Sequence, residues 1–443
     1  MNHIHRKLYP LASIAAGVVT LAAALPASAI DLTNADGTWK FSLNGNVNVD
    51  YIYSNCETAS KVAPVVTVGG ACTGDASGNN VSSIANGLLP AAFVFGVSTT
   101  QDGIDLAAHL GLYPGIATND GGSPNLKQTA GGPTTNGLNG GTTNVALGTT
   151  GLDLRQVYMT FGNKDMGTFT LGRNFGLFGF DAIINDMTLI GVGVGGQASG
   201  PSPANTTLGS IGFGYIYVDT LAQMNYTTPD FSGANLTVGI FEPVNSLTEP
   251  GIPAAKSAPG FHGKIAWSGK FGDDMKLSLS ATGIEQKQDY DLSATTAGSF
   301  RSVGGDVFAK LDIGSLSLTA SGYDGKGMGT TGLYFLADDG HGNARPSYGY
   351  LLQGTYTIQQ VKFGVNYGVS RLAFTNASAA ANAADRAAVP DLLAENEKVT
   401  GGVYYSLTKN LTLLGEVSRV WTIAHNDGEN KSTDVDFGAF LAF

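Results

Sequence analysis

Hydrophobic and polar side chains alternate along most of the chain. The clearest stretch is residues 39–53, where one parity carries Trp39, Phe41, Leu43, Val47, Val49, Tyr51 and Tyr53 and the other carries Lys40, Ser42, Asn44, Asn46, Asn48 and Asp50. Successive side chains of a β-strand point to opposite faces, so the pattern predicts a strand with one apolar and one polar face. Lys40 belongs to the polar face. Residues 433–443 repeat the pattern and end in Phe443.

The same alternation recurs along the chain. The connections between the predicted strands are by turns short and long. The predicted strands are residues 39–53, 88–100, 104–113, 152–161, 168–173, 219–228, 234–242, 261–269, 275–286, 303–312, 316–323, 348–357, 361–371, 397–407, 411–422 and 433–443. Up-and-down strands in even number close into a barrel when the first strand pairs with the last, which removes exposed edges. We therefore predict an all-β, antiparallel, up-and-down transmembrane barrel of about 16 strands.

A second apolar face separates this chain from soluble all-β proteins. A soluble sandwich also has alternating strands, but its outer faces are polar. Here Tyr348, Tyr350 and Leu352, and in the next strand Phe363 and Val365, form an outer apolar face that no other predicted element covers. Hydrocarbon can cover such a face, and a closed barrel leaves no backbone group unpaired in lipid.

The first residues have the features of a secretory leader. Arg6 and Lys7 precede an apolar stretch at residues 11–25, and Ala27-Ser28-Ala29 is a small-residue cleavage site. We predict a signal peptide at residues 1–29 and the barrel at residues 30–443. The formal charge of the full chain is −11 and loss of Arg6 and Lys7 makes it −13, which argues against nucleic-acid binding.

The only two cysteines, Cys56 and Cys72, lie in one Gly/Ser/Thr-rich stretch. Export to an oxidising compartment favours a disulfide within that predicted loop, and two free thiols are the alternative. No histidine is near them, so no metal site is predicted there. The sequence predicts no metal or cofactor elsewhere either.

Two stretches carry a family resemblance. Residues 155–162 read Arg-Gln-Val-Tyr-Met-Thr-Phe-Gly, residues 167–176 end in Gly-Arg-Asn-Phe-Gly, and residues 228–233 read Thr-Pro-Asp-Phe-Ser-Gly. They resemble the trimeric general-diffusion porins of Gram-negative bacteria. The resemblance implies a homotrimer among outer-membrane lipid and lipopolysaccharide, a third loop folded into the barrel, and passive diffusion of small hydrophilic solutes and ions.

The resemblance also implies a pore constriction. Arg155 and Arg173 would supply its positive charge, and Asp181 and Asp186 would supply negative charge from the third loop. Opposed charges across a narrow lumen create a transverse field. The predicted strands at residues 88–100 and 219–228 lack arginine, so we expect a weaker field than is typical of the family.

Parity complicates the facing of both arginines. Arg155 has the parity of Val157 and Met159, and Arg173 that of Phe169 and Leu171. We predict that both face the lumen, which for Arg155 requires either a β-bulge or an outward-facing Tyr158. Parity places other charged residues in the lumen without difficulty: Lys264, Lys310, Lys362, Lys398, Glu416, Asp434 and Asp436. Each of these either hydrates the wall or tunes selectivity.

The sequence leaves three other functions to consider. No nucleophile elbow accompanies the histidines, so we predict that the chain is not an enzyme. A substrate-selective channel, for a sugar or an ion, remains an alternative within transport. An adhesive or structural barrel is the other, because of the long Gly/Thr/Asn-rich loop at residues 114–150.

Overall fold

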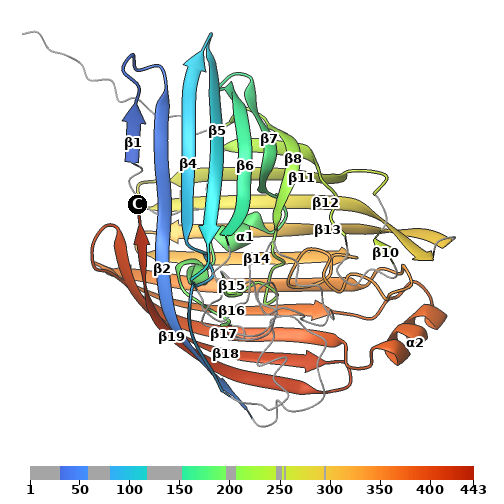
Figure 1. Ribbon diagram of the computed structural model, residues 1–443. Coiled ribbons are helices and arrows are strands. Elements are labelled where there is room, and N and C mark those ends of the chain that lie inside the picture. The colour runs from blue at the N-terminus through green and yellow to red at the C-terminus, as the bar shows by residue number, and fades with distance from the viewer. Residues whose placement is uncertain are drawn as a thin grey trace, which may run out of the picture.

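The computed structural model describes residues 30–57, 80–116, 152–195, 206–245, 252–253, 256–293 and 296–443. Within them one antiparallel sheet curls into a closed barrel (Figure 1). The sixteen wall strands are β2 (Lys40–Cys56), β4 (Ala92–Gln101), β5 (Ile104–Pro114), β6 (Leu152–Asn163), β7 (Gly167–Phe175), β8 (Thr220–Thr227), β9 (Ala234–Phe241), β11 (Gly260–Phe271), β12 (Met275–Ser293), β13 (Thr296–Ile313), β14 (Leu316–Lys326), β15 (Pro346–Ile358), β16 (Val361–Leu372), β17 (Leu393–Ser406), β18 (Leu411–Ala424) and β19 (Glu429–Ala442). The predicted sixteen-stranded barrel is confirmed.

The first and last wall strands close the barrel. β19 pairs with β2 from Ser432 opposite Cys56 to Ala442 opposite Asn46. Three short strands add to the wall without changing its order: β1 (Ile30–Thr33) and β3 (Val81–Ala85) pair with β2, and β10 (Ile252–Pro253) pairs with β12. Closure gives hydrogen-bond partners to the backbone groups that an open sheet would leave unpaired at its two edges.

The predicted short connections are tight turns. Between β4 and β5 the chain turns on Asp102 and Gly103, both with positive φ, at 51° and 78°. Two such residues make a type I′ turn, whose twist matches the strands on either side. Asp-Gly at this place in the sequence therefore fixes the hairpin register.

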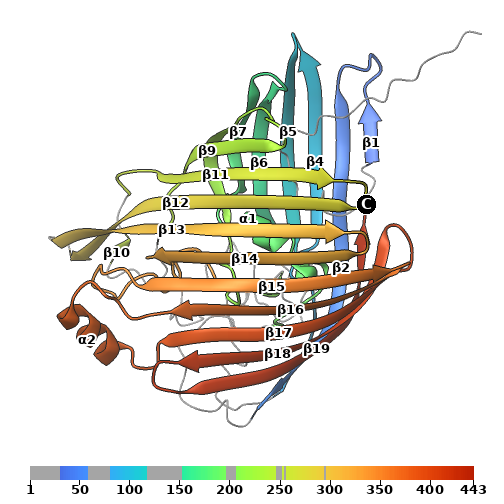
Figure 2. The same cartoon turned by 180° about the vertical axis from the view of Figure 1, so that it is seen from behind.

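One hairpin is longer than predicted. β12 continues to Ser293 and β13 begins at Thr296, where the sequence predicted a loop. In Figure 2 the hairpin projects at the same end of the barrel as α2 (Ala379–Ala388). Polar residues of both parities occupy the extension, and ion pairs join Arg301 to Glu285 and Lys287 to Asp289. The extension has no row of alternating apolar residues, which is the signal that predicts the other strands. The alternation therefore marks only the part of each strand that faces the membrane.

The two faces of the wall have opposite character. Outward-facing Phe363 and Val365 are 45% and 54% exposed, while inward-facing Asn366 is 1% exposed. Among the described residues no helix has both the length and the hydropathy to span a bilayer.

Candidate functional site

The segment between β7 and β8 follows the inner wall. We call its described residues, 176–195 and 206–219, the inner segment; it contains α1 (Phe180–Ile184) and a 3-10 helix (Met187–Ile190). Its backbone N–H groups bond in order to wall side chains further round the barrel: Gly179 to Asp306 of β13, Met187 to Gln353 of β15, Gly193 to Glu416 of β18 and Gly195 to Asp434 of β19. These contacts hold the described residues of the segment against the inner wall.

Asp186 ties the inner segment both to itself and to the wall. Its carboxylate accepts hydrogen bonds from Thr188 N (3.0 Å), Ser210 N (3.1 Å), the Tyr215 hydroxyl (2.8 Å) and Asn366 Nδ2 of β16 (3.2 Å). Burial, together with the Asp186 charge, raises the pKa of Tyr215, so its hydroxyl remains a donor. No arginine is among these four partners, so Asp186 acts here as an anchor of the segment.

Glu416 is a second anchor. Its Oε2 accepts hydrogen bonds from Val192 N at 3.0 Å and Gly193 N at 2.7 Å, and its Oε1 accepts one from the Tyr404 hydroxyl. The predicted lumen-facing parity of Glu416 agrees with its place on the inner wall, but the inner segment covers it and leaves it 2% exposed. Lys398, fully buried beside it, donates to Thr400 Oγ1 at 3.2 Å.

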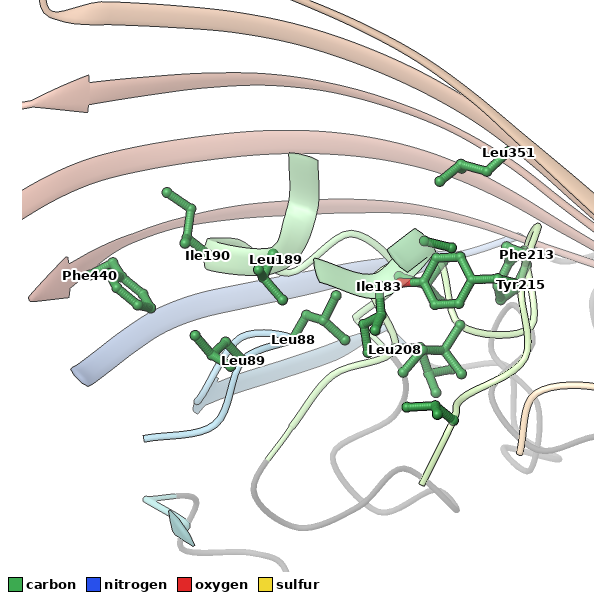
Figure 3. Packing of buried hydrophobic residues seen from close by; sticks show 14 of the residues in the cluster. Leu88, Leu89, Ile183, Leu189, Ile190, Leu208, Phe213, Tyr215, Leu351 and Phe440 are labelled. Atoms are coloured by element: carbon green, nitrogen blue, oxygen red, sulfur yellow. The ribbon is translucent and has the colours of Figure 1, made fainter. Parts of the chain in front are cut away.

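An apolar core fills the space between the inner segment and the wall. Figure 3 shows Ile183, Leu189 and Ile190 of the segment packed with Leu88 and Leu89, which precede β4. The wall contributes Leu351, Tyr404, Leu414, Val420 and Phe440. Burying this apolar surface holds the segment in place, in addition to its hydrogen bonds.

Two inner-wall lysines, Lys264 and Lys310, contact the first part of the segment, and a third lies against the wall. Lys264 Nζ lies 2.6 Å from Asp181 Oδ2, and the Ser280 hydroxyl donates to the same carboxylate. Lys310 Nζ donates to Asn185 Oδ1 at 3.3 Å, and Lys362 Nζ lies 4.3 Å from the centre of the Tyr404 ring. The structure therefore brings Asp181 to an inner-wall lysine, whereas sequence reasoning placed it opposite arginines.

A β-bulge turns Arg155 inward. Gly111 pairs with Gln156 and Leu112 with Leu154, so Arg155 is the extra residue of β6. Before the bulge the even-numbered Leu152 and Leu154 face outward, and after it the odd-numbered Val157 and Met159 do. The guanidinium lies 5.5 Å from the Tyr113 ring centre and donates to the Tyr217 hydroxyl of the inner segment at 3.4 Å.

Arg173 is placed differently from the prediction. Its register neighbours are Val157 and Ala222, both exposed on the outward face, and its own side chain is exposed. β7 has no register shift that would reverse its parity, so Arg173 shares the outward face of Phe169 and Leu171. Of the four predicted constriction residues, it is the one that the fold turns away from the lumen.

Two remaining predictions concern the first wall strand. Lys40, at the beginning of β2, is exposed and has the inward parity of Asn46 and Asn48. Cys56 is buried at the end of β2, while Cys72 lies outside the described residues. The disulfide between them stays a prediction.

Sequence reasoning did not recognise a group of inward carboxylates near Glu416. Asp436 is the register partner of Glu416, and Asp434 lies two residues before it. Asp50 lies opposite Gly438, and its carboxylate is so close that a Cβ atom on residue 438 would be 1.9 Å away. Their shared parity was visible in the sequence, but their proximity depends on the pairing of β2 with β19. Among the described residues, no group of three or more His, Cys, Asp or Glu is arranged to hold a metal ion.

A cavity of about 600 Å³ remains beside the inner segment. It is bounded by the inner faces of β7, β8, β9 and β11, by α1 and by turn residues Lys164 and Pro229. Its wall includes Thr237, which alternates with outward-facing Val238, 45% exposed.

These two neighbours offer a matched test of the wall. Val238→Arg is expected to destabilise the folded barrel by about 2–4 kcal/mol, because the charge would enter hydrocarbon near the middle of β9. Thr237→Arg adds the same charge at the same depth but points it into the cavity, so most of the stability is expected to remain. Urea titration of folding into lipid vesicles measures both, and equal losses would contradict the assigned faces.

Comparisons with known proteins agree with this architecture. The sequence model of the Gram-negative porin family matches residues 12–422. The chain belongs to this family. No curated protein matches its sequence significantly.

Solved structures share the fold at low sequence identity. The outer membrane channel DcaP of Acinetobacter baumannii superposes with a TM-score of 0.61 at 13% identity, covering 93% of this chain and 99% of that one. Salmonella typhi OmpF, in complex with daunomycin, gives 0.54 at 12% identity, covering 94% and 100%. Pseudomonas putida OprB gives 0.52 at 12% identity, covering 92% and 95%.

Family and fold together define the function at a coarse level. The protein is a channel of the bacterial outer membrane through which small solutes diffuse passively.

Proposed function

We propose that the inner segment sets the size limit of this channel and that the pore discriminates weakly between anions and cations. The observation that carries the proposal is the series of hydrogen bonds from Gly179 to Gly195, which holds the segment against the wall from β13 to β19. A segment held over this length narrows the lumen on one side without closing it.

Weak selectivity follows from how the charges are paired. Asp181 is neutralised by Lys264 at 2.6 Å, and Asp186 is surrounded by four donors within the segment and β16. Arg155 lies between two tyrosines. Few opposed charges then remain to build a transverse field, in line with the departures from the family pattern.

Reversal potentials in a salt gradient test this proposal. A perfectly selective pore in a tenfold KCl gradient would reverse near 60 mV, since a tenfold ratio is 1.4 kcal/mol and a charge gains about 2.3 kcal/mol per 100 mV. We expect stepwise openings in planar bilayers and a reversal potential far below that limit. A reversal potential near the limit would contradict weak selectivity, and an absence of openings would favour the adhesive alternative.

The remaining expectations complete the proposal. Residues 1–29 would be removed as a signal peptide, and the mature chain would assemble as a homotrimer surrounded by lipid and lipopolysaccharide. The protein would perform no catalysis. His262, one of the histidines on strands, has a packing role: it stacks on Phe241 with ring centres 3.8 Å apart and accepts a hydrogen bond from Leu177 N.

Gel filtration with light scattering of the detergent-solubilised protein tests the assembly. A mass of three chains is expected, and a single chain would overturn it.

A further inference from the structure

The cavity beside the inner segment has a lining suited to a particular class of solute. Its walls come from β7, β8, β9 and β11, and its volume of about 600 Å³ lies within the range of small-molecule sites. Lys164 and Pro229, from the short turns, bound one end, and Phe180 and Asp181 of α1 bound another. A solute crossing the lumen at the short-turn end would pass this cavity.

Uncharged hydrogen-bonding side chains dominate the lining. Thr168, Thr227 and Thr237 are register neighbours on three successive strands, and Thr170 is the neighbour of Asn225. They form rows of hydroxyl and amide groups across the wall. Such groups both donate and accept, as a hydroxyl-bearing solute does.

Some of these lining groups bond to one another and others have no partner among the described residues. Thr227 and Thr237 bond to each other at 2.9 Å, and Asn225 Nδ2 donates to Gln223 at 2.5 Å. Within the described part of the chain, no side-chain hydrogen bond engages Thr168, Thr170 or Asn235. Their donors and acceptors are therefore available to a solute.

The charges on the lining are already compensated. Lys264 pairs with Asp181 at 2.6 Å, and Lys164 pairs with Asp165 at 2.7 Å. Asp230 accepts a hydrogen bond from Gly233 N at 3.0 Å. The lining itself holds two lysines and two aspartates, so a net charge on the solute gains little.

An apolar surface completes the cavity. Phe175 and Phe180 both line it, and their ring centres are 5.6 Å apart with planes inclined by 36°. The C–H face of a sugar ring packs on such rings while its hydroxyls reach the amides and hydroxyls around them.

We propose that this cavity is a binding subsite for a neutral polyhydroxylated solute of the size of a mono- or disaccharide. The inference rests on the proposed passage of solutes along the lumen and adds a preferred chemical class to it. It needs no conformational change, because the groups are in place along rigid strands.

Current block in planar bilayers tests the subsite, with maltose as the neutral probe and galacturonate as a charged one. Maltose added at the short-turn end is expected to reduce the KCl conductance in a saturable way, beyond the effect of viscosity, whereas galacturonate should not saturate. The double variant Thr170→Val, Asn235→Leu removes hydrogen-bonding groups with little change of volume. Its half-saturating maltose concentration is expected to rise about tenfold, the equivalent of one to two lost hydrogen bonds.

A matched control is Thr319→Val, at a buried inner-wall position on β14 outside this cavity. It should leave the block by maltose unchanged. Both variants should keep the KCl conductance of the unmodified protein, which shows that they fold. Normal conductance without saturable block, or equal block in the double variant, would overturn the subsite, whereas absent conductance would instead overturn the proposed function.

Discussion

Asp186→Ala is expected to raise the single-channel conductance and the current noise of the pore. The carboxylate holds four donors from three parts of the fold: Thr188, Ser210 with Tyr215, and Asn366 of β16. Hydrogen bonds to a charged group contribute roughly 1.5–3 kcal/mol each. Losing them leaves buried donors unpaired, so the inner segment should leave the wall and widen the lumen.

Two further variants sharpen this test. Asp186→Asn keeps one acceptor oxygen and places an amide against the remaining donors, so an intermediate effect is expected. Asp273→Ala removes an exposed carboxylate from the turn between β11 and β12, away from the cavity and the inner segment, and should leave the conductance and its noise unchanged. If Asp186→Ala conducts with the size and noise of the unmodified protein, Asp186 does not hold the segment.

Asp385→Ala is expected to detach α2 from the rim of the barrel. Arg345 donates to its two oxygens from Nε at 3.1 Å and Nη2 at 2.5 Å, and Thr375 N donates at 2.9 Å. The side chains of the pair are only 4% and 0% exposed. Removing one partner of a buried pair leaves an uncompensated charge and costs about 3–5 kcal/mol.

The loss should appear locally, because the strands keep their ladders. Limited proteolysis of the protein in lipid vesicles is expected to cleave within residues 373–392 in Asp385→Ala and not in the unmodified protein. The variant Arg345→Met, Asp385→Ala removes both charges and should recover most of the resistance. Ala384→Ser, at an exposed position on the same helix, serves as the control. Equal resistance in all four proteins would contradict the anchoring role.

The wall of this protein was predictable because its physics is local. Alternation in residues 39–53 or 361–371 reflects the two media on either side of the sheet, and Asp102-Gly103 encodes its own turn. The lumen-facing parity of Lys264, Lys398 and Glu416 follows from the same pattern. Where one face is not apolar, as in the extension of β12 and β13, the pattern gives no signal.

The site depended on contacts that the sequence does not display. Glu416 bonds to Gly193 across 223 residues of chain, and no local pattern marks either as the partner of the other. Resemblance suggested opposed charges for Asp181 and Asp186, whereas their neighbours in the fold are Lys264 and a set of neutral donors. Arg155 shows that one inserted residue in β6 is enough to reverse a facing that parity alone would assign.

The pairing of β19 with β2 constrains the order of biogenesis. The edge of β2 has no permanent wall neighbour until the last strand has been synthesised and delivered to it, so every earlier intermediate carries two unsatisfied edges. The closing contact joins the two wall strands that lie furthest apart in sequence, so it can form only when both ends of the barrel are in place. An exported chain must be kept soluble until that moment.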